Sequence, residues 1–214
     1  MSIKVCIVDN TCVDVGNMLG FTFGDKELSR LDKIQNKGRK SESLAALEAL
    51  RNITEDISDR RIERDALGRP HFKNAKEIDF SIAHSGSLSV AARVDSNFGI
   101  GVDIELIKEK DNTRIADRFF TEKEKSFLDR MKNNDGFYML WTAKEAKAKK
   151  VGGGLSALLA DKSDLSEGND RFLRFSVEYK QSVYMLTLCV EREEKVEFLC
   201  DDSICVECLK GALL

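Results

Sequence analysis

The chain has 214 residues, of which 34 are Lys or Arg and 37 are Asp or Glu, giving a formal net charge of −3. That length allows one large domain or two small halves, and it provides a sizeable apolar core without a metal or disulfide for folding. The acidic balance argues against a bulk nucleic-acid binder, which would normally carry a basic excess, so any basic site must be local.

The start of the chain predicts a first strand rather than a targeting segment. Its apolar run is too short for a signal peptide and meets an acidic residue at Asp9. No stretch approaches the roughly 18 apolar residues of a membrane-spanning helix. We therefore expect a cytoplasmic protein that does not bind membranes.

Hydrophobic periodicity predicts strands and helices along the whole chain, and their order indicates a mixed α+β fold. The first series comprises strands at 3–8 and 12–15, helices at 25–35 and 40–57, and strands at 78–83 and 87–94. The last two strands are expected to pair across Ser85-Gly86-Ser87. The second series comprises a strand at 99–107, helices at 121–132 and 136–151, and strands near 172–179, 183–191 and 195–200.

Two carboxylates share one face of the strand that opens the second series. Ile100, Val102 and Ile104 alternate there with smaller or polar residues, which is the period-two pattern of a half-buried strand. Asp103 and Glu105 therefore point the same way, with roughly 7 Å between their Cα atoms from a rise of about 3.3 Å per residue. That separation allows both carboxylates to bind one cation.

The helix expected at 136–151 carries a third carboxylate. It is rich in Ala, Lys and Glu, which favour a helix, and Trp141, Glu145 and Lys149 recur every four residues along one stripe. If this helix packs on the strand, its glutamate converges with the two strand carboxylates beside a lysine. Such a site suits Mg²⁺ with a phosphate ligand, because this ion keeps several waters and takes only a few carboxylates.

An ordinary structural explanation stays open on these residues alone. In a chain with 37 Asp and Glu residues, an acidic pair two residues apart is most often a solvated strand face. A Glu-Lys pair four residues apart is usually ordinary support for a helix. Spacing alone therefore does not establish the metal site.

A wider pattern extends over roughly residues 68–156, in a series of short segments that are weak singly but specific in their order and spacing. The segments are Gly68-Arg-Pro70, Phe80-Ser-Ile-Ala-His-Ser85, Gly101-Val-Asp-Ile-Glu105, Arg118-Phe-Phe-Thr-Glu-Lys-Glu124, Trp141-Thr-Ala-Lys-Glu-Ala146, Lys149 and Gly152-Gly-Gly-Leu-Ser156. This set resembles the 4′-phosphopantetheinyl transferases, specifically the larger, Sfp-like class similar to the surfactin-synthetase-activating enzyme. The rest of the chain matches that class only in general character.

The resemblance implies two similar α+β halves related by a pseudo-twofold, with the active site in the cleft between them. A boundary near residue 98 makes residues 1–98 the N-terminal half, which contacts the nucleotide of coenzyme A. Residues 99–214 are then the C-terminal half, with the metal-binding carboxylates and the catalytic helix. The protein is expected to be a monomer.

The implied reaction moves the phosphopantetheine arm of coenzyme A onto a serine hydroxyl of an apo acyl or peptidyl carrier protein and releases adenosine 3′,5′-bisphosphate. This is activity of the holo-acyl-carrier-protein synthase type, with Mg²⁺ expected and Mn²⁺ as an alternative. Carriers of fatty-acid, polyketide and nonribosomal-peptide biosynthesis all stay open. Two rival functions are a non-catalytic protein that binds coenzyme A or another nucleotide diphosphate, and a Mg²⁺-dependent phosphoryl transferase or hydrolase with a small-molecule acceptor.

The resemblance also assigns roles around the metal. Asp103, Glu105 and Glu145 are the implied ligands, with water completing the coordination sphere because Ile104 stands where some relatives carry an acid. Glu145 is also a candidate base for the serine hydroxyl, although a bound cation lowers the pKa of a carboxylate and favours the ligand role. Lys149 is expected to contact the diphosphate and stabilise the departing phosphate as a point charge.

Coenzyme A contacts are implied elsewhere in the pattern. His84 follows a strand in a Ser-rich turn and is expected to bind the diphosphate or the 3′-phosphate. Ala83 stands where many relatives have serine, which removes one hydroxyl contact, and Arg69 is expected at the nucleotide end. A basic run is a candidate for the 3′-phosphate, with the solvated start of a helix as an equal alternative. Its residues are Lys37, Arg39 and Lys40.

Other features have ordinary structural interpretations. Trp141 opens an amphipathic helix and is expected in the core, and Gly152-Gly-Gly154 is expected to cap that helix rather than hold phosphate. The six cysteines are expected to be reduced thiols, because no secretory signal is evident. Cys200, Cys205 and Cys208 leave a zinc site open as an alternative, although a fourth ligand is missing locally.

Overall fold

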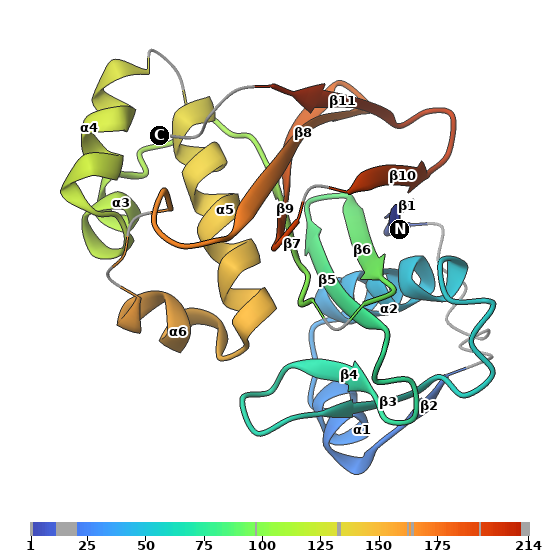
Figure 1. Ribbon diagram of the computed structural model, residues 1–214. Helices are drawn as coiled ribbons and strands as arrows, with labels where there is room; N and C mark the ends of the chain where they lie inside the picture. The colour runs from blue at the N-terminus through green and yellow to red at the C-terminus, as the bar shows by residue number, and fades with distance from the viewer. Residues whose placement is uncertain are drawn as a thin grey trace.

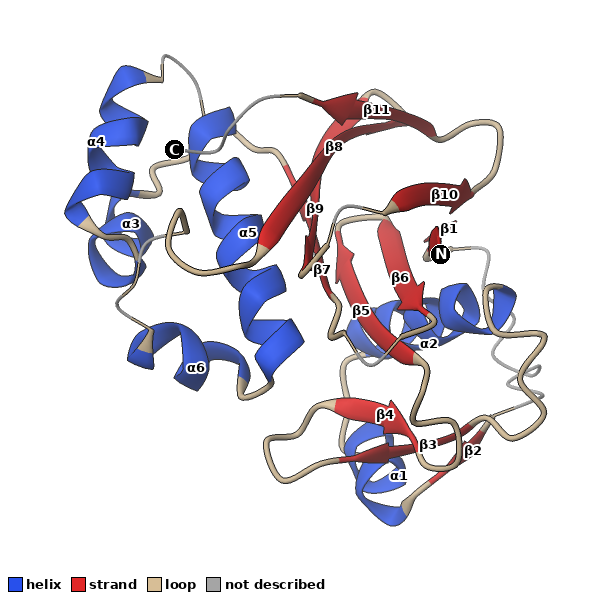
Figure 2. Cartoon of the chain, viewed as in Figure 1, coloured by secondary structure: helices blue, strands red, loops and turns tan. Residues whose placement is uncertain are grey.

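The structure is a computed structural model, in which helices and strands are mixed along the chain (Figures 1 and 2). This confirms the expected α+β class. None of the helices in the described ranges is long and apolar enough to span a bilayer. The described residues are 2–11, 21–96, 98–131, 134–161, 163, 165–192 and 194–210.

The first sheet combines strands from both ends of the chain. In order across the sheet, its strands are β10 (Lys195–Leu199), β1 (Ser2–Asp9), β6 (Leu88–Val94) and β5 (Asp79–Ser85). β1 is parallel to β10 and antiparallel to β6, which forms the expected hairpin with β5. Because β10 lies after residue 98, the two sheets do not separate at that position, and the boundary there stays a prediction.

The second sheet is antiparallel throughout. In order, its strands are β11 (Cys205–Leu209), β8 (Arg171–Tyr179), β9 (Ser182–Val190) and β7 (Gly101–Leu106). A small third sheet contains β2 (Thr22–Phe23), β3 (Arg61–Arg64) and β4 (Pro70–Phe72). β5 and β7 are thus edge strands of their respective four-stranded sheets.

One long helix covers each large sheet (Figure 1). α2 (Lys37–Asn52) packs on β1, β5 and β6, whereas α5 (Asp135–Val151) packs on β7 and β9. The shorter helices are α1 (Asp25–Asp32), α3 (Thr113–Phe119), α4 (Glu122–Arg130) and α6 (Gly154–Ala160). Each sheet has a long helix of its own, which is compatible with a pseudo-twofold, and that symmetry stays a prediction.

The central core lies between the two large sheets. Alternate residues of the strands fill it, including Val5 of β1, Val90 of β6, Val102 of β7 and Leu188 of β9, all 0% exposed. A second apolar cluster lies between α2 and the first sheet, and a third between α5, α3 and the second sheet. Every residue of β6 is buried, because its sheet is covered on both faces.

Most expected elements are confirmed within a few residues of their bounds, and the strand expected at 12–15 lies outside the described residues. The elements that the sequence did not indicate are β2, β3, β4, α3, α6 and β11. Most of them are too short to establish a period of two or 3.6 residues. β11 in addition alternates only between exposed and half-buried positions, so it lacks a clear apolar face.

Strand β7 and helix α5 approach each other unusually closely at one glycine. A Cβ placed on Gly101 would lie 1.8 Å from the backbone oxygen of Ala146, which leaves no room for any side chain. The strand therefore presents bare backbone to the helix at this point. The same contact sets the distance between α5 and the other positions of β7 that face this helix.

Gly101→Ala is expected to destabilise the protein, because the obstructing atoms belong to backbone and cannot rotate away. We expect a loss of about 1–3 kcal/mol in the free energy of unfolding, measured by denaturant titration. Gly99→Ala is the matched control, since its Cβ would meet the flexible side chain of Lys150 at 3.2 Å and Asp79 Oδ2 at an ordinary contact distance of 3.7 Å. Equal stability of the two variants would show that the close approach does not constrain the fold.

Candidate functional site

A cavity of about 450 Å³ lies between residues that precede position 98 and residues that follow it. The first group is Arg30, Ser43, Ala46, Arg64, Leu67, Gly68, Arg69, Pro70, Phe80, Ser81, Ile82, Ala83 and His84. The second group is Asp103, Glu105, Glu145, Ala148, Lys149, Gly152, Gly153 and Gly154. The three expected metal ligands and Lys149 therefore line one cavity.

The alternation of β7 positions two of these carboxylates. Val102 and Ile104 fill the core between the sheets, so Asp103 and Glu105 point to the opposite face, toward α5. Glu145 reaches the same cavity from α5. The strand and the helix do pack together, as the spacing argument required.

Asp103 is the most deeply buried of the three carboxylates, at 5% exposed. Its Oδ1 accepts a 2.6 Å hydrogen bond from Lys149 Nζ, whereas its buried Oδ2 accepts none. Burial raises the pKa of Asp103 to about 7, with Lys149 opposing the shift and Glu105 and Glu145 adding to it. A single ammonium group therefore leaves the negative charge of this cluster incompletely balanced.

The other two carboxylates differ in their partners. Burial raises the pKa of Glu145, Lys149 lowers it, and the nearby charge of Glu105 raises it further. Glu105 Oε2 accepts a 2.8 Å hydrogen bond from Ser85 Oγ, which was not expected from the sequence. Ser85 thus holds Glu105 in place from the edge of the first sheet.

The donor set fits a hard divalent cation. Three carboxylates face one cavity, neighbouring negative charges add to the raised pKa of Asp103 and of Glu145, and one buried oxygen of Asp103 lacks a partner. In the part of the chain that the structure describes, no three His, Cys, Asp or Glu side chains are arranged so that they could hold one metal ion as they stand. Lys149 contacts Asp103 and Ser85 contacts Glu105, so these side chains would have to turn to share an ion.

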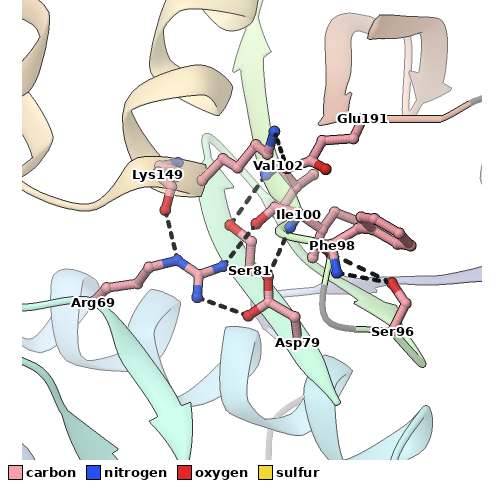
Figure 3. Close-up of polar contacts among 10 residues, drawn as sticks. Arg69, Asp79, Ser81, Ser96, Phe98, Ile100, Val102, Lys149 and Glu191 are labelled. Carbon is pink, nitrogen blue, oxygen red and sulfur yellow. Dashed lines mark hydrogen bonds and ion pairs between the residues drawn. The ribbon is translucent and has the colours of Figure 1, made fainter. Parts of the chain in front are cut away.

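Arg69 lines the cavity, but its guanidinium is engaged by protein groups (Figure 3). Its terminal nitrogens bind the Asp79 carboxylate at 2.7 and 2.6 Å. Its Nε donates to Lys149 O and its Nη2 to Ile100 O, both at 3.0 Å. Arg69 therefore ties β5 to the end of α5 and to the residue before β7, and its contact with a nucleotide stays a prediction.

His84 lines the cavity at the end of β5, where its Nδ1 lies 3.3 Å from Glu42 Oε2. Burial lowers the pKa of His84, although Glu42 opposes that shift. The imidazole is therefore mainly neutral near pH 7, and it would offer a phosphate a hydrogen bond more than a charge.

The structure does not bring the basic run to the cavity. Lys37, Arg39 and Lys40 lie exposed in the first turn of α2 and are not among the lining residues. Two arginines that the sequence analysis did not single out line it instead, Arg30 of α1 and Arg64 of β3. Two sequence features could have indicated them: Arg30 lies in a short charged helix, and Arg64 lies shortly before the Gly68-Arg-Pro70 segment.

The two cavity arginines are held by one buried acid. Glu27 is 1% exposed, and it binds Arg30 Nη2 at 2.7 Å and also contacts Arg64. Burial would raise the pKa of Glu27, but hydrogen bonds from both arginines keep it below its ordinary value. The pair therefore retains a net positive charge next to the cavity.

The segment Arg118–Glu124 supports the site from behind. Thr121 and Glu124 form a reciprocal cap at the start of α4, and the buried Glu124 also binds Lys144 Nζ of α5 at 3.0 Å. Trp141 packs edge-on against Phe119 at 5.3 Å between ring centroids, which confirms its expected place in the core. These contacts hold α3 and α4 against α5.

The glycine run after α5 both ends that helix and borders the cavity. Gly152 has φ of 86°, and its amide donates to Ala148 O at 2.9 Å, which confirms the expected cap. Gly153 has φ of 88° and is the N-cap residue that precedes α6. All three glycines also line the cavity.

The five cysteines in the described part of the chain lie away from this cavity. Cys6, Cys189, Cys200, Cys205 and Cys208 are free thiols. Burial raises the pKa of Cys6 to about 11, whereas Cys205 and Cys208 are exposed on β11. The sixth cysteine, at position 12, lies outside the described residues.

Comparisons with known proteins point to one family. Residues 99–201 match the profile of the 4′-phosphopantetheinyl transferase superfamily. The chain is 39% identical over 104 residues to 4′-phosphopantetheinyl transferase Sfp from Bacillus subtilis (strain 168), covering 47% of this chain and 45% of that protein. It is 40% identical over 82 residues to 4′-phosphopantetheinyl transferase gsp from Aneurinibacillus migulanus, covering 37% and 33%.

A further relative is 4′-phosphopantetheinyl transferase AcpT from Salmonella typhimurium (strain LT2), 31% identical over 90 residues, covering 40% of this chain and 46% of that protein. The chain thus spans less than half the length of each of these relatives in its matched region. The matched segments include the strand and helix that carry the three carboxylates, as the profile covers residues 99–201.

Glu145→Gln is expected to raise the melting temperature of the metal-free protein while weakening its stabilisation by Mg²⁺. The glutamine keeps the size of the side chain but removes one of three like charges in a site whose burial already disfavours charge. Thermal unfolding with and without Mg²⁺ measures both effects. Glu122→Gln, whose side chain is 90% exposed on α4, is the control and should change neither. A lower melting temperature for metal-free Glu145→Gln would contradict the electrostatic description.

Proposed function

We propose that this protein transfers the phosphopantetheine arm of coenzyme A to a carrier protein, because residues 99–201 match the 4′-phosphopantetheinyl transferase superfamily. The acceptor is a serine hydroxyl of an apo acyl or peptidyl carrier, and adenosine 3′,5′-bisphosphate is released. The activity is of the holo-acyl-carrier-protein synthase type, in its Sfp-like form.

One observation carries the proposal: Asp103, Glu105, Glu145 and Lys149 line the same cavity from two different elements. A strand face and a helix stripe supply them, and each would be unremarkable alone. Their convergence gives a hard-cation donor set with an ammonium beside it, which is the arrangement that transfer from a diphosphate needs. A non-catalytic binding protein would not require both the three carboxylates and the lysine.

The residues have distinct chemical tasks in this proposal. Bound Mg²⁺ supplies charge neutralisation at the diphosphate, and Asp103, Glu105 and Glu145 would hold it. Lys149 Nζ donates to Asp103 Oδ1 at 2.6 Å, and in the loaded enzyme its ammonium would turn from this carboxylate toward the phosphates that depart. Glu145, whose pKa is raised by burial, is the candidate to accept the serine proton, directly or through water.

The nucleotide end of coenzyme A would occupy the part of the cavity that is lined by residues before position 98. Arg30 and Arg64 supply positive charge there, and His84 supplies a neutral hydrogen-bonding ring. Phosphates bind well to such paired arginines, because each guanidinium offers two parallel donors. We place the enzyme in the cytoplasm as a monomer, with Mg²⁺ as the metal and Mn²⁺ as a substitute.

Transfer is tested by intact-mass spectrometry of apo carrier proteins incubated with this protein, coenzyme A and Mg²⁺. A carrier is expected to gain the mass of one phosphopantetheine arm only when the metal is present. A panel with fatty-acid, polyketide and nonribosomal-peptide carriers would also indicate the physiological partner. Metal-dependent binding of coenzyme A with no mass gain on any carrier would favour the binding-protein function instead.

Lys149→Met is expected to lower the transfer rate about a hundred-fold, because one preorganised charge at the phosphates is lost. Lys147→Met is the matched control: it lies two residues earlier on α5, pairs with Asp161 at 2.7 Å and does not line the cavity. Single-turnover rates on a responsive carrier measure both variants. Equal rates would show that Lys149 has no part in the transfer.

A further inference from the structure

The two large sheets meet where their edge strands β5 and β7 face each other, and these strands belong to different sheets. Side chains of β5 bridge them. Three backbone amides, from the residue before β7 and from two residues of β7, donate to side-chain oxygens of β5. This contact joins the part of the chain that carries Arg69 and His84 to the strand that carries two of the carboxylates.

Three such bonds form a regular series. Asp79 Oδ2 accepts from Ile100 N at 2.7 Å, Ser81 Oγ from Val102 N at 3.0 Å and Ser85 Oγ from Leu106 N at 3.1 Å. Figure 3 shows the first two. The donor lies 21 residues after the acceptor in every case. We name these bonds the β5–β7 ladder.

The constant offset shows that the two strands run parallel without slipping. Side chains of alternate residues of β5 face β7, and alternate amides of β7 face β5. A slip of one residue would turn Asp103 and Glu105 into the apolar core and bring Val102 and Ile104 to the cavity. The ladder therefore opposes a shift in register that would turn the two carboxylates away from the cavity.

Both ends of the ladder also contact the site directly. Ser85 accepts the Leu106 amide and donates to Glu105 Oε2 at 2.8 Å. Asp79 accepts the Ile100 amide and binds Arg69, which in turn donates to Lys149 O. The ladder thus connects the strand carboxylate at one end with the lysine-bearing turn of α5 at the other.

One position of the ladder lacks an acceptor. The offset of 21 residues places the Ile104 amide opposite Ala83, whose methyl side chain has no oxygen. Both residues are buried, at 0% and 4% exposed. A hydrogen-bond acceptor within reach of such a buried amide would stabilise the fold, because burial keeps water from bonding the amide instead.

We infer that Asp79, Ser81 and Ser85 are positioning residues that fix the register of β7 and thereby aim Asp103 and Glu105 into the cavity, and that position 83 is a gap in this device. The role of the aimed carboxylates rests on the proposed function, whereas the ladder itself does not. A serine at position 83 would complete the series by accepting the Ile104 amide, in addition to any contact with a ligand.

Amide hydrogen exchange followed by NMR tests the ladder without metal, coenzyme A or carrier. Ser81→Ala is expected to speed exchange at Val102 at least tenfold while leaving the β1 amide of Val5 unchanged, and Ser81→Thr should restore protection. Ala83→Ser should slow exchange at Ile104 about tenfold and raise the melting temperature by about 2–4 °C. Unchanged exchange at Val102 in Ser81→Ala, or at Ile104 in Ala83→Ser, would overturn the ladder.

Mg²⁺ titration, followed by thermal unfolding, tests the positioning role. Ser81→Ala and Ser85→Ala are expected to need about tenfold more Mg²⁺ for half of the full stabilisation. Ser89→Ala is the control, since this buried serine bonds Asn10 and Glu42 but not β7. An equal Mg²⁺ requirement for Ser81→Ala and Ser89→Ala would overturn the positioning role. If the wild-type protein shows no response to Mg²⁺, the proposed function fails while the exchange data still decide on the ladder.

Discussion

The contact between β7 and α5 at Gly101 is the constraint on which the site depends. A helix and a strand normally keep a layer of side chains between them, but here a Cβ at Gly101 would lie 1.8 Å from Ala146 O. The absence of that Cβ lets the helix approach closely enough for Glu145 to share a cavity with Asp103 and Glu105. The geometry of the proposed metal site therefore depends on this close backbone contact.

That close approach concentrates negative charge, which disfavours the ionised carboxylates when no cation balances them. Asp103 is 5% exposed with one oxygen unpartnered, and burial raises its pKa to about 7. Lys149 offsets part of this charge, and Ser85 binds Glu105 from the other sheet. Sites of this kind commonly trade stability for function, because the ligand supplies the charge that the folded chain lacks. The surrounding contacts, including the ion pair of Glu124 with Lys144, hold α5 in place despite this charge.

The sequence predicted the carboxylates because their signals are local. Alternation over Ile100–Ile104 and the four-residue stripe of Trp141, Glu145 and Lys149 each depend on neighbours within one element. The partners of Arg69 were not predictable in this way, since they lie 10, 31 and 80 residues away. The basic residues next to the cavity were not predictable either, because a basic helix turn need not face a ligand. Only the fold shows that Arg30 lines the cavity and Lys37 does not.

A crystal structure of the protein with Mn²⁺ and coenzyme A would test the central claim most directly, because anomalous scattering locates the metal without assumptions about its ligands. The account predicts one ion coordinated by oxygens of Asp103, Glu105 and Glu145 together with the diphosphate, and Lys149 turned from Asp103 toward a phosphate. An ion bound elsewhere, or coenzyme A bound with the Lys149–Asp103 contact intact and no ion between the three carboxylates, would contradict it.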